Sequence, residues 1–222
     1  MRYQAVLFDL DGTLADTLYD LTDALGAALL LHGLEAYDAQ RVKMLVGTGW
    51  ENLIRGALRE KAGDQKLAKS VGEAFKAHYD AHFMDKTAAY EGIPALLDAL
   101  RANGVGLGVV TNKRRYMARL VLERLFGDKI RVVYGPGDGV PGKPDPCMPR
   151  LAMRDLHAPP ERTLFVGDSA VDILTAKAAG TASAGVLWGF RGEAELKSAG
   201  ADHIVGEPAE LLEIVGITNL KG

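Results

Sequence analysis

The sequence predicts an α/β protein with a Rossmann-like open parallel sheet and an inserted α-helical domain. Three observations support this prediction. Short apolar runs alternate with helical patterns, polar clusters follow several of the runs, and one long stretch near the N-terminus is helical throughout. Alternating strands and helices favour a parallel sheet covered by helices. Buried parallel strands are continuous apolar runs, as these are.

Six short runs rich in Val, Leu, Ile, Ala and Phe are predicted as buried strands. They span residues 5–8, 107–110, 131–134, 164–166, 184–187 and 203–205. Because ligands in open α/β sheets bind beyond the carboxyl ends of the strands, we expect the functional site at that edge.

Helical periodicity occupies segments between these strands. Apolar residues recur at a spacing of 3.6 residues over 93–103, 116–126 and 172–179. Gly104 and Gly180 follow two of these segments, and glycine is common just beyond a helix C-terminus. The pattern therefore predicts helices that connect the parallel strands.

The stretch between residues 17 and 86 contains no strand candidate. Helices are expected over residues 20–31, 50–60 and 67–83. The 222 residues correspond to about one and a half domains at roughly 150 residues each. We therefore expect a discontinuous α/β domain, residues 1–16 and 87–222, interrupted by a helical domain, residues 17–86.

Composition excludes several classes of protein. A formal net charge of −3, from 26 basic and 29 acidic residues, argues against a broad nucleic-acid-binding face. Cys147 is the single cysteine, so no intrachain disulfide can form, which fits a reducing compartment. The apolar run at residues 5–8 is too short for a signal-peptide core or a membrane span. We expect a cytoplasmic protein without nucleic-acid or membrane partners.

Two carboxylates follow the first predicted strand. Asp9 and Asp11 point the same way while the chain stays extended, and Gly12 then permits a sharp turn. Two acids this close raise the pKa of one of them unless a cation lies between them. Mg²⁺ binds one or two carboxylates together with phosphate oxygens and water. These three residues alone fit such a site and a solvated Asp-Gly turn about equally, whereas the full string at residues 9–16 at a strand end favours the metal site.

The string DLDGTLAD at residues 9–16 resembles the signature of the haloacid dehalogenase superfamily of phosphohydrolases. The resemblance implies that Asp9 is the nucleophile and forms an aspartyl-phosphate. It implies that Asp11 is the general acid/base, which protonates the leaving alcohol and then activates water. It also implies that Asp9 and the backbone carbonyl of Asp11 bind Mg²⁺.

Two later segments resemble the superfamily's phosphate-binding motifs. They are VVTNK at residues 109–113 and GKPDP at residues 142–146. The resemblance implies that the Thr111 hydroxyl and the Asn112 backbone amide contact the phosphoryl group, with Gly12 beside them. It assigns Lys143 to neutralise Asp9 and the phosphoryl oxygens. Considered without the other motifs, a serine or threonine at a strand end, such as Thr111, is more often an ordinary helix cap.

The segment GDS at residues 167–169, with Asp172, resembles the fourth motif. The resemblance implies that Asp168 is a Mg²⁺ ligand and that Ser169 and Asp172 support the metal's water shell. An acid at this position could instead cap the following helix. The resemblance covers essentially the whole chain.

The helical insertion lies where the superfamily carries a cap that closes over the site and selects substrates. Gly47, Thr48, Gly49 and Trp50 fall between two predicted cap helices. They could approach a small substrate, or form a plain interhelical turn.

Within the superfamily the chain looks most like phosphoglycolate phosphatases. Similar segments lie at residues 47–49, 90–93, 111–113, 167–180 and 189–190. We expect a Mg²⁺-dependent phosphatase for a small phosphorylated metabolite, 2-phosphoglycolate above all, acting as a monomer or homodimer. Glu91 replaces the usual Pro, which leaves the substrate open. Alternatives are a phosphatase for another small organic phosphate or pyrophosphate, a sugar phosphomutase, or a non-catalytic binding protein with this fold.

Overall fold

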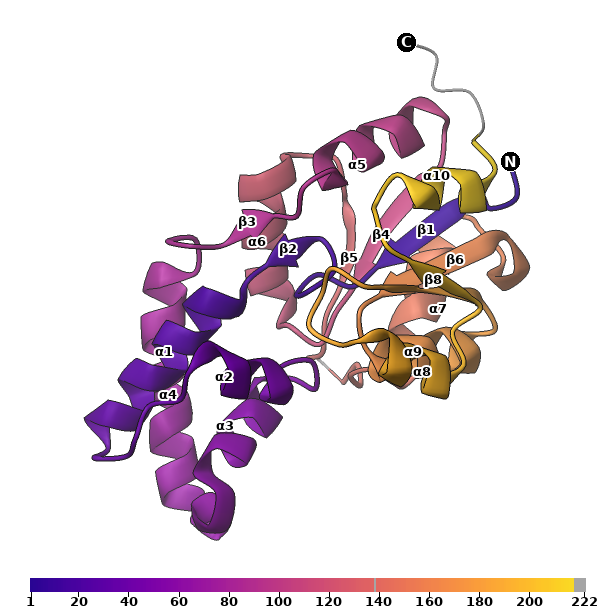
Figure 1. The fold of residues 1–222 in the computed structure, drawn as a ribbon. Coiled ribbons are helices and arrows are strands. Elements are labelled where there is room, and N and C mark those ends of the chain that lie inside the picture. The colour runs from indigo at the N-terminus through magenta and orange to yellow at the C-terminus, as the bar shows by residue number, and fades with distance from the viewer. Residues whose placement is uncertain (138, 218–222) are drawn as a thin grey trace. The chain divides into compact units, whose positions relative to one another are not determined.

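The computed structural model describes residues 1–137 and 139–217, and its centre is a six-stranded parallel sheet (Figure 1). The strands are β1 (Ala5–Phe8), β4 (Gly106–Val110), β5 (Val132–Tyr134), β6 (Thr163–Gly167), β7 (Ala182–Val186) and β8 (His203–Val205). Their order is β5-β4-β1-β6-β7-β8, and every neighbouring pair is parallel. The predicted α/β class is therefore confirmed, and the topological switch point lies between β1 and β6.

Helices cover the sheet on both sides (Figure 1). They are α5 (Ile93–Ala102), α6 (Arg115–Phe126), α7 (Cys147–Asp155), α8 (Ala170–Ala179), α9 (Glu193–Ala199) and α10 (Glu210–Val215), with a 3₁₀ turn at Pro160–Arg162. Leu7 and Phe165 pack with Met148 and Ala152 of α7 and with Ala176 of α8 on one face. Every residue of β1 is buried, which explains its unbroken apolar sequence.

The chain divides into two compact units. The α/β unit comprises Met1–Ala15 and Ala89–Gly222, and the helical unit comprises Asp16–Ala88. Two short strands, β2 (Ala15–Asp16) and β3 (Ala88–Ala89), pair with each other where the chain passes between the units.

The helical unit contains four α-helices among its described residues. They are α1 (Leu18–Leu31), α2 (Ala39–Leu45), α3 (Trp50–Leu58) and α4 (Gln65–His82), with a 3₁₀ turn at Arg59–Gly63. The Phe75 ring stacks between Trp50 and Tyr79, with ring centroids 6.4 and 5.7 Å away. Across the described part of the chain, no helix has the length and apolarity needed to cross a membrane.

Candidate active site

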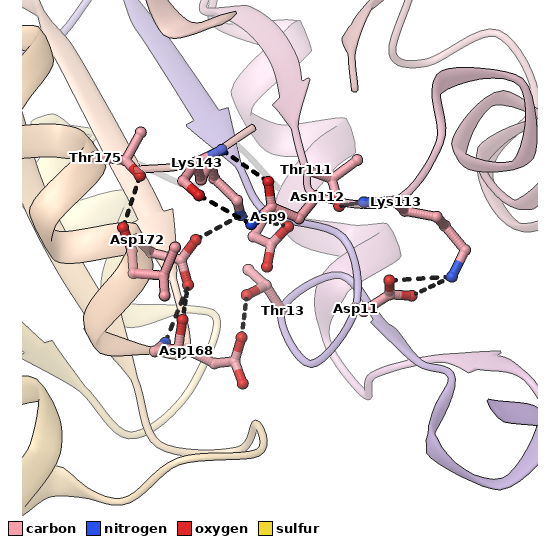
Figure 2. A network of polar contacts seen from close by, with 12 residues as sticks. Asp9, Asp11, Thr13, Thr111, Asn112, Lys113, Lys143, Asp168, Asp172 and Thr175 are labelled. Carbon is pink, nitrogen blue, oxygen red and sulfur yellow. Dashed lines mark hydrogen bonds and ion pairs between the residues drawn. The ribbon is translucent and has the colours of Figure 1, made fainter. Parts of the chain in front are cut away.

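A cluster of polar side chains lies at the switch point of the sheet (Figure 2). Asp9 directly follows β1, Thr111 directly follows β4, and Asp168 directly follows β6. Lys143 joins them from the loop between β5 and α7. The parallel sheet thus brings together residues that are up to 159 positions apart in the sequence, because these strand ends meet at one edge.

Lys143 links two carboxylates in the interior of this cluster. Its Nζ lies 2.8 Å from Asp9 Oδ1 and 2.6 Å from Asp172 Oδ1. The three side chains are 1%, 7% and 0% exposed. Burial by itself lowers the pKa of Lys143, but the charges of Asp172 and Asp9 outweigh it and hold that pKa above its usual range. Lys143 is therefore a permanent buried cation.

The acids of the cluster outnumber this cation. Asp9, Asp168 and Asp172 can each place a carboxylate oxygen within 4.8 Å of the others. Burial, opposed by Lys143 and reinforced by Asp172, raises the pKa of Asp9 to about 6. Burial and the charges of Asp172 and Asp9 raise the pKa of Asp168 to about 8. The single positive charge of Lys143 does not balance the negative charges of the three carboxylates. Carboxylate oxygens are the ligands that hard divalent cations prefer, so the cluster fits a metal ion.

Asp168 is held rigidly by groups from two loops. Its Oδ2 accepts a 2.7 Å hydrogen bond from the Phe190 backbone N–H, and its Oδ1 accepts one of 3.2 Å from Thr13. The Trp188 indole in turn donates to the Thr13 carbonyl at 3.0 Å. Gly12 has φ +85° and a Cβ there would lie 2.5 Å from Asp168 Oδ2, so only glycine fits this turn.

Asp172 caps a helix and also contacts the buried lysine, while its support of a metal's water shell stays a prediction. Its Oδ2 accepts hydrogen bonds from the Ser169 backbone N–H at 3.0 Å and the Ser169 hydroxyl at 2.7 Å. This forms a capping box at the start of α8. Its other oxygen binds Lys143, so the same carboxylate caps the helix and belongs to the acidic cluster.

The Asn112 side chain fixes the loop that carries Lys143. Asn112 Oδ1 accepts from the Lys143 backbone N–H at 2.7 Å, and Asn112 Nδ2 donates to the Lys143 carbonyl at 3.3 Å. A Cβ at Gly142 would lie 2.7 Å from Asn112 Oδ1, which explains the glycine beside the lysine. The sequence motif predicted a role for the Asn112 backbone amide, but it did not predict these hydrogen bonds of the Asn112 side chain.

The Asp11 carboxylate forms an ion pair with Lys113. Lys113 Nζ donates to both of its carboxylate oxygens, at 2.8 and 3.0 Å. Figure 2 shows the Asp11 carboxylate on the side of the site away from Lys143 and Asp172. Lys113 belongs to the motif at residues 109–113, but the sequence assigned it no role; only its place two residues after Thr111 could have indicated one.

Of the four candidate substrate residues of the helical unit, Gly47, Thr48 and Gly49 lie in the turn between α2 and α3, and Trp50 begins α3. Gly47 and Gly49 adopt φ values of +116° and +94°, and the Thr48 carbonyl accepts a hydrogen bond from Asn52. The Trp50 ring stacks on Phe75 within the helical unit. Substrate contact by these residues stays a prediction.

Comparison with known proteins identifies the family. The family described as haloacid dehalogenase-like hydrolase matches residues 6–186. N-acetylmuramic acid 6-phosphate phosphatase of Pseudomonas aeruginosa is 36% identical, with 97% of this chain and 96% of that protein covered. Phosphoglycolate phosphatase of Rhodospirillum rubrum is 37% identical, with 99% and 93% covered.

Solved structures give the same result. A crystal structure from Lactobacillus delbrueckii subsp. bulgaricus has a TM-score of 0.92 and 32% identity, with 97% of this chain and 99% of that one covered. A hydrolase of the same family from Deinococcus radiodurans, crystallised with phosphate and sodium, has a TM-score of 0.75 and 27% identity, with 97% of both chains covered. The chain therefore belongs to the haloacid dehalogenase-like hydrolases.

Proposed function

We propose that the protein is a Mg²⁺-dependent phosphomonoester hydrolase that works through an aspartyl-phosphate on Asp9. The observation that carries the proposal is the buried Asp9 carboxylate at the end of β1, paired with Lys143 and adjacent to the oxygens of Asp168 and Asp172. Attack on a phosphate dianion requires a nucleophilic carboxylate, a fixed cation and further acidic side chains that can bind a metal ion.

In the proposed first step, an Asp9 oxygen attacks phosphorus while the bond between phosphorus and the alcohol oxygen breaks. Asp11 gives its proton to the departing oxygen. Lys143, the Thr111 hydroxyl and the Asn112 backbone N–H balance the charge on the phosphoryl oxygens, beside the Gly12 turn.

In the second step, Asp11 takes a proton from water, whose oxygen attacks phosphorus and releases phosphate and the Asp9 carboxylate. Asp9, Asp168 and the Asp11 carbonyl would hold Mg²⁺, with Ser169 and Asp172 behind them. When bound, Mg²⁺ supplies positive charge that offsets the repulsion between the phosphate and the carboxylates.

The substrate we propose is 2-phosphoglycolate. The named relatives act on phosphoglycolate and on N-acetylmuramic acid 6-phosphate, and both compounds are phosphomonoesters of hydroxy acids. The turn at Gly47, Thr48, Gly49 and Trp50 would contribute from the helical unit, which would act as a cap (residues 17–86). The single cysteine, Cys147, is consistent with a cytoplasmic site of action.

A phosphate-release screen with Mg²⁺ tests the proposal. It should include 2-phosphoglycolate, N-acetylmuramic acid 6-phosphate, pyrophosphate and a hexose phosphate. Asp9→Asn should lower turnover by at least about 10³-fold, because the amide cannot form the intermediate. Circular dichroism should show an intact fold.

Asp98→Asn is the matched control, since Asp98 is an exposed residue that pairs with Lys129. It should keep wild-type activity. Wild-type turnover by Asp9→Asn would rule out the mechanism, and no phosphate release from any compound would favour a binding protein. Conversion of the hexose phosphate to an isomer, without free phosphate, would identify a phosphomutase.

A further inference from the structure

The segment between β7 and α9, residues 187–192, is anchored to the strand and the helix on either side of Asp168. β7, which precedes the segment, pairs directly with β6. In α9, which follows it, the Glu195 carboxylate accepts a 3.0 Å hydrogen bond from the backbone N–H of Ala170, the first residue of α8. The segment is therefore held in place independently of its own contacts with Asp168.

Two residues of this segment lie directly against Asp168. The Phe190 backbone N–H donates to Asp168 Oδ2 at 2.7 Å. A Cβ at Gly189 would lie 2.3 Å from Asp168 Cβ and 2.3 Å from the Gly12 carbonyl oxygen. The chain can approach this closely only as glycine, so the segment packs on Asp168 and on the turn after β1 at the same time.

Thr13, in that turn, links Trp188 to Asp168. Thr13 is 0% exposed, its backbone N–H donates to the Leu10 carbonyl at 3.2 Å, and its carbonyl accepts from the Trp188 indole at 3.0 Å. Its hydroxyl donates to Asp168 Oδ1 at 3.2 Å, as Figure 2 shows. A hydrogen bond of this length depends on where the donor is held, because such bonds weaken with distance and misalignment. The indole therefore influences the contact between Thr13 and Asp168.

These hydrogen bonds fix the direction of the Asp168 carboxylate and leave it able to bind a cation. Among the described contacts, Oδ1 accepts one hydrogen bond from Thr13 and Oδ2 accepts one from Phe190. Each carboxylate oxygen has two lone pairs, so one on each oxygen is left for a metal ion. Groups that orient a ligand from behind are typical of metal sites, and their loss lowers the affinity for the metal.

We propose that Trp188 is a positioning residue for the metal ion. Through the Thr13 carbonyl, its indole holds the Thr13 hydroxyl, and thereby the Asp168 carboxylate, in the orientation that binds Mg²⁺. The inference rests on the proposed Mg²⁺-dependent function and deepens it by adding a residue that touches neither metal nor substrate. Coupling of this kind is reciprocal, so bound Mg²⁺ must stabilise the hydrogen bond between Trp188 and Thr13 by the same factor.

Mg²⁺ titration calorimetry on the protein without substrate tests the inference. Trp188→Phe keeps an aromatic ring but removes the donor, and should weaken Mg²⁺ binding about 10-fold or more, as the loss of an orienting group does at other metal sites. The Mg²⁺ concentration that gives half-maximal phosphate release should rise by the same factor. At saturating Mg²⁺, kcat should stay within about twofold of the wild type, because excess metal refills the site.

Tyr37→Phe is the matched control. The Tyr37 hydroxyl donates to the Ala57 carbonyl at 2.9 Å within the helical unit, so this variant also removes an aromatic donor from a backbone carbonyl. It should lower stability in urea to a similar extent as Trp188→Phe and leave Mg²⁺ affinity unchanged. Equal weakening of Mg²⁺ binding in both variants would refute the inference, and so would wild-type affinity in Trp188→Phe.

A double variant tests the route through Thr13. Thr13→Val removes the hydroxyl and should by itself weaken Mg²⁺ binding. Adding Trp188→Phe should then change the affinity less than about twofold, because the group that the indole positions is already gone. Losses that add in full would show that Trp188 does not act through Thr13, and would overturn the inference.

If Trp188→Phe does not fold, the wild-type protein provides the test. Saturating Mg²⁺ should slow the exchange of the Trp188 indole proton, followed by NMR, about 10-fold or more, as reciprocity requires. An unchanged exchange rate would overturn the inference and leave the hydrolase proposal intact. A wild-type protein that binds no Mg²⁺, or releases phosphate equally well without it, would instead contradict the proposed metal site and this inference with it.

Discussion

At the scale of single residues, Asp168 has the most unusual environment in the site. Burial and two neighbouring acids raise its pKa to about 8, while Thr13 and the Phe190 backbone hold it in place. The folded protein therefore binds this proton more tightly than the unfolded chain does. Without metal, the free energy of unfolding should fall as pH rises from about 4 to about 8.

A divalent cation at Asp168 must displace that proton. With a pKa of about 8, the carboxyl favours its protonated form at neutral pH when no metal is bound. Mg²⁺ affinity should rise by up to about tenfold per pH unit below that value, with release of about one proton per ion. Titration calorimetry in two buffers of different ionisation enthalpy measures both quantities.

The Asp168→Asn variant is the control for this experiment. It should lose the metal-linked proton release and be more stable than the wild-type protein at alkaline pH without metal. Binding of Mg²⁺ with no proton release at neutral pH would show that Asp168 is already ionised and would contradict the prediction.

Sequence reasoning succeeded for residues whose position on a strand end decides their neighbours. Asp9, Thr111 and Asp168 meet because parallel strands end at one edge. It could not find interactions that depend on side-chain direction in loops. Three such interactions join loops whose conformations cannot be predicted from sequence periodicity. They are the hydrogen bond between Asn112 and the Lys143 backbone, that between Thr13 and Asp168, and the ion pair between Lys113 and Asp11.

At the scale of secondary structure, the six strands were predicted within two residues of their observed ends because buried parallel strands are uninterrupted apolar runs. Four helices were not predicted: α2, α7, α9 and α10. The sequence of α7 includes Pro149, which is tolerated in the first turn because the N–H there has no helical partner. The expected helix over 50–60 ends at Leu58, where Arg59 takes φ +50° and a 3₁₀ turn begins.

The link between β4 and the loop before α7 gives a prediction at this scale. Asn112→Ala removes the acceptor of the Lys143 backbone N–H in a buried place. The free energy of unfolding should fall by about 1–3 kcal/mol, because a buried donor is left without a partner. Phosphate release should fall as well, since Lys143 loses its fixed position.

Asn103→Ala is the matched control, because the Asn103 side chain is exposed and bonds only to Ala99 of its own helix among the described contacts. Its stability in urea should lie within about 0.5 kcal/mol of the wild type. If both asparagine variants unfold at the same urea concentration, the hydrogen bonds between the Asn112 side chain and the Lys143 backbone contribute nothing to the free energy of unfolding.

At the scale of the whole molecule, the chain enters the helical unit at Asp16 and leaves it at Ala88. Asp20, in the first turn of α1, connects the segment that enters the helical unit with the segment that leaves it. This residue is only 2% exposed. Its carboxylate accepts from the Lys86 backbone N–H at 2.9 Å and from the Thr87 backbone N–H and hydroxyl at 2.9 and 2.7 Å. The periodicity of α1 gives no reason for an acid on its buried face, so only the three-dimensional structure explains this residue.

Asp20→Ala should therefore loosen the exit of the helical unit and lower its stability by about 2–4 kcal/mol, because buried donors lose their acceptor. Hydrogen exchange should accelerate at the amides of Lys86 and Thr87. Asp80→Ala, which breaks an ion pair with Lys76 on the surface of α4, should cost less than about 1 kcal/mol and leave those amides unchanged. If the Lys86 and Thr87 amides were equally protected from hydrogen exchange in both variants, Asp20 would not hold the segment that leaves the helical unit. The pairing of β2 with β3 would then hold the entering and leaving segments together.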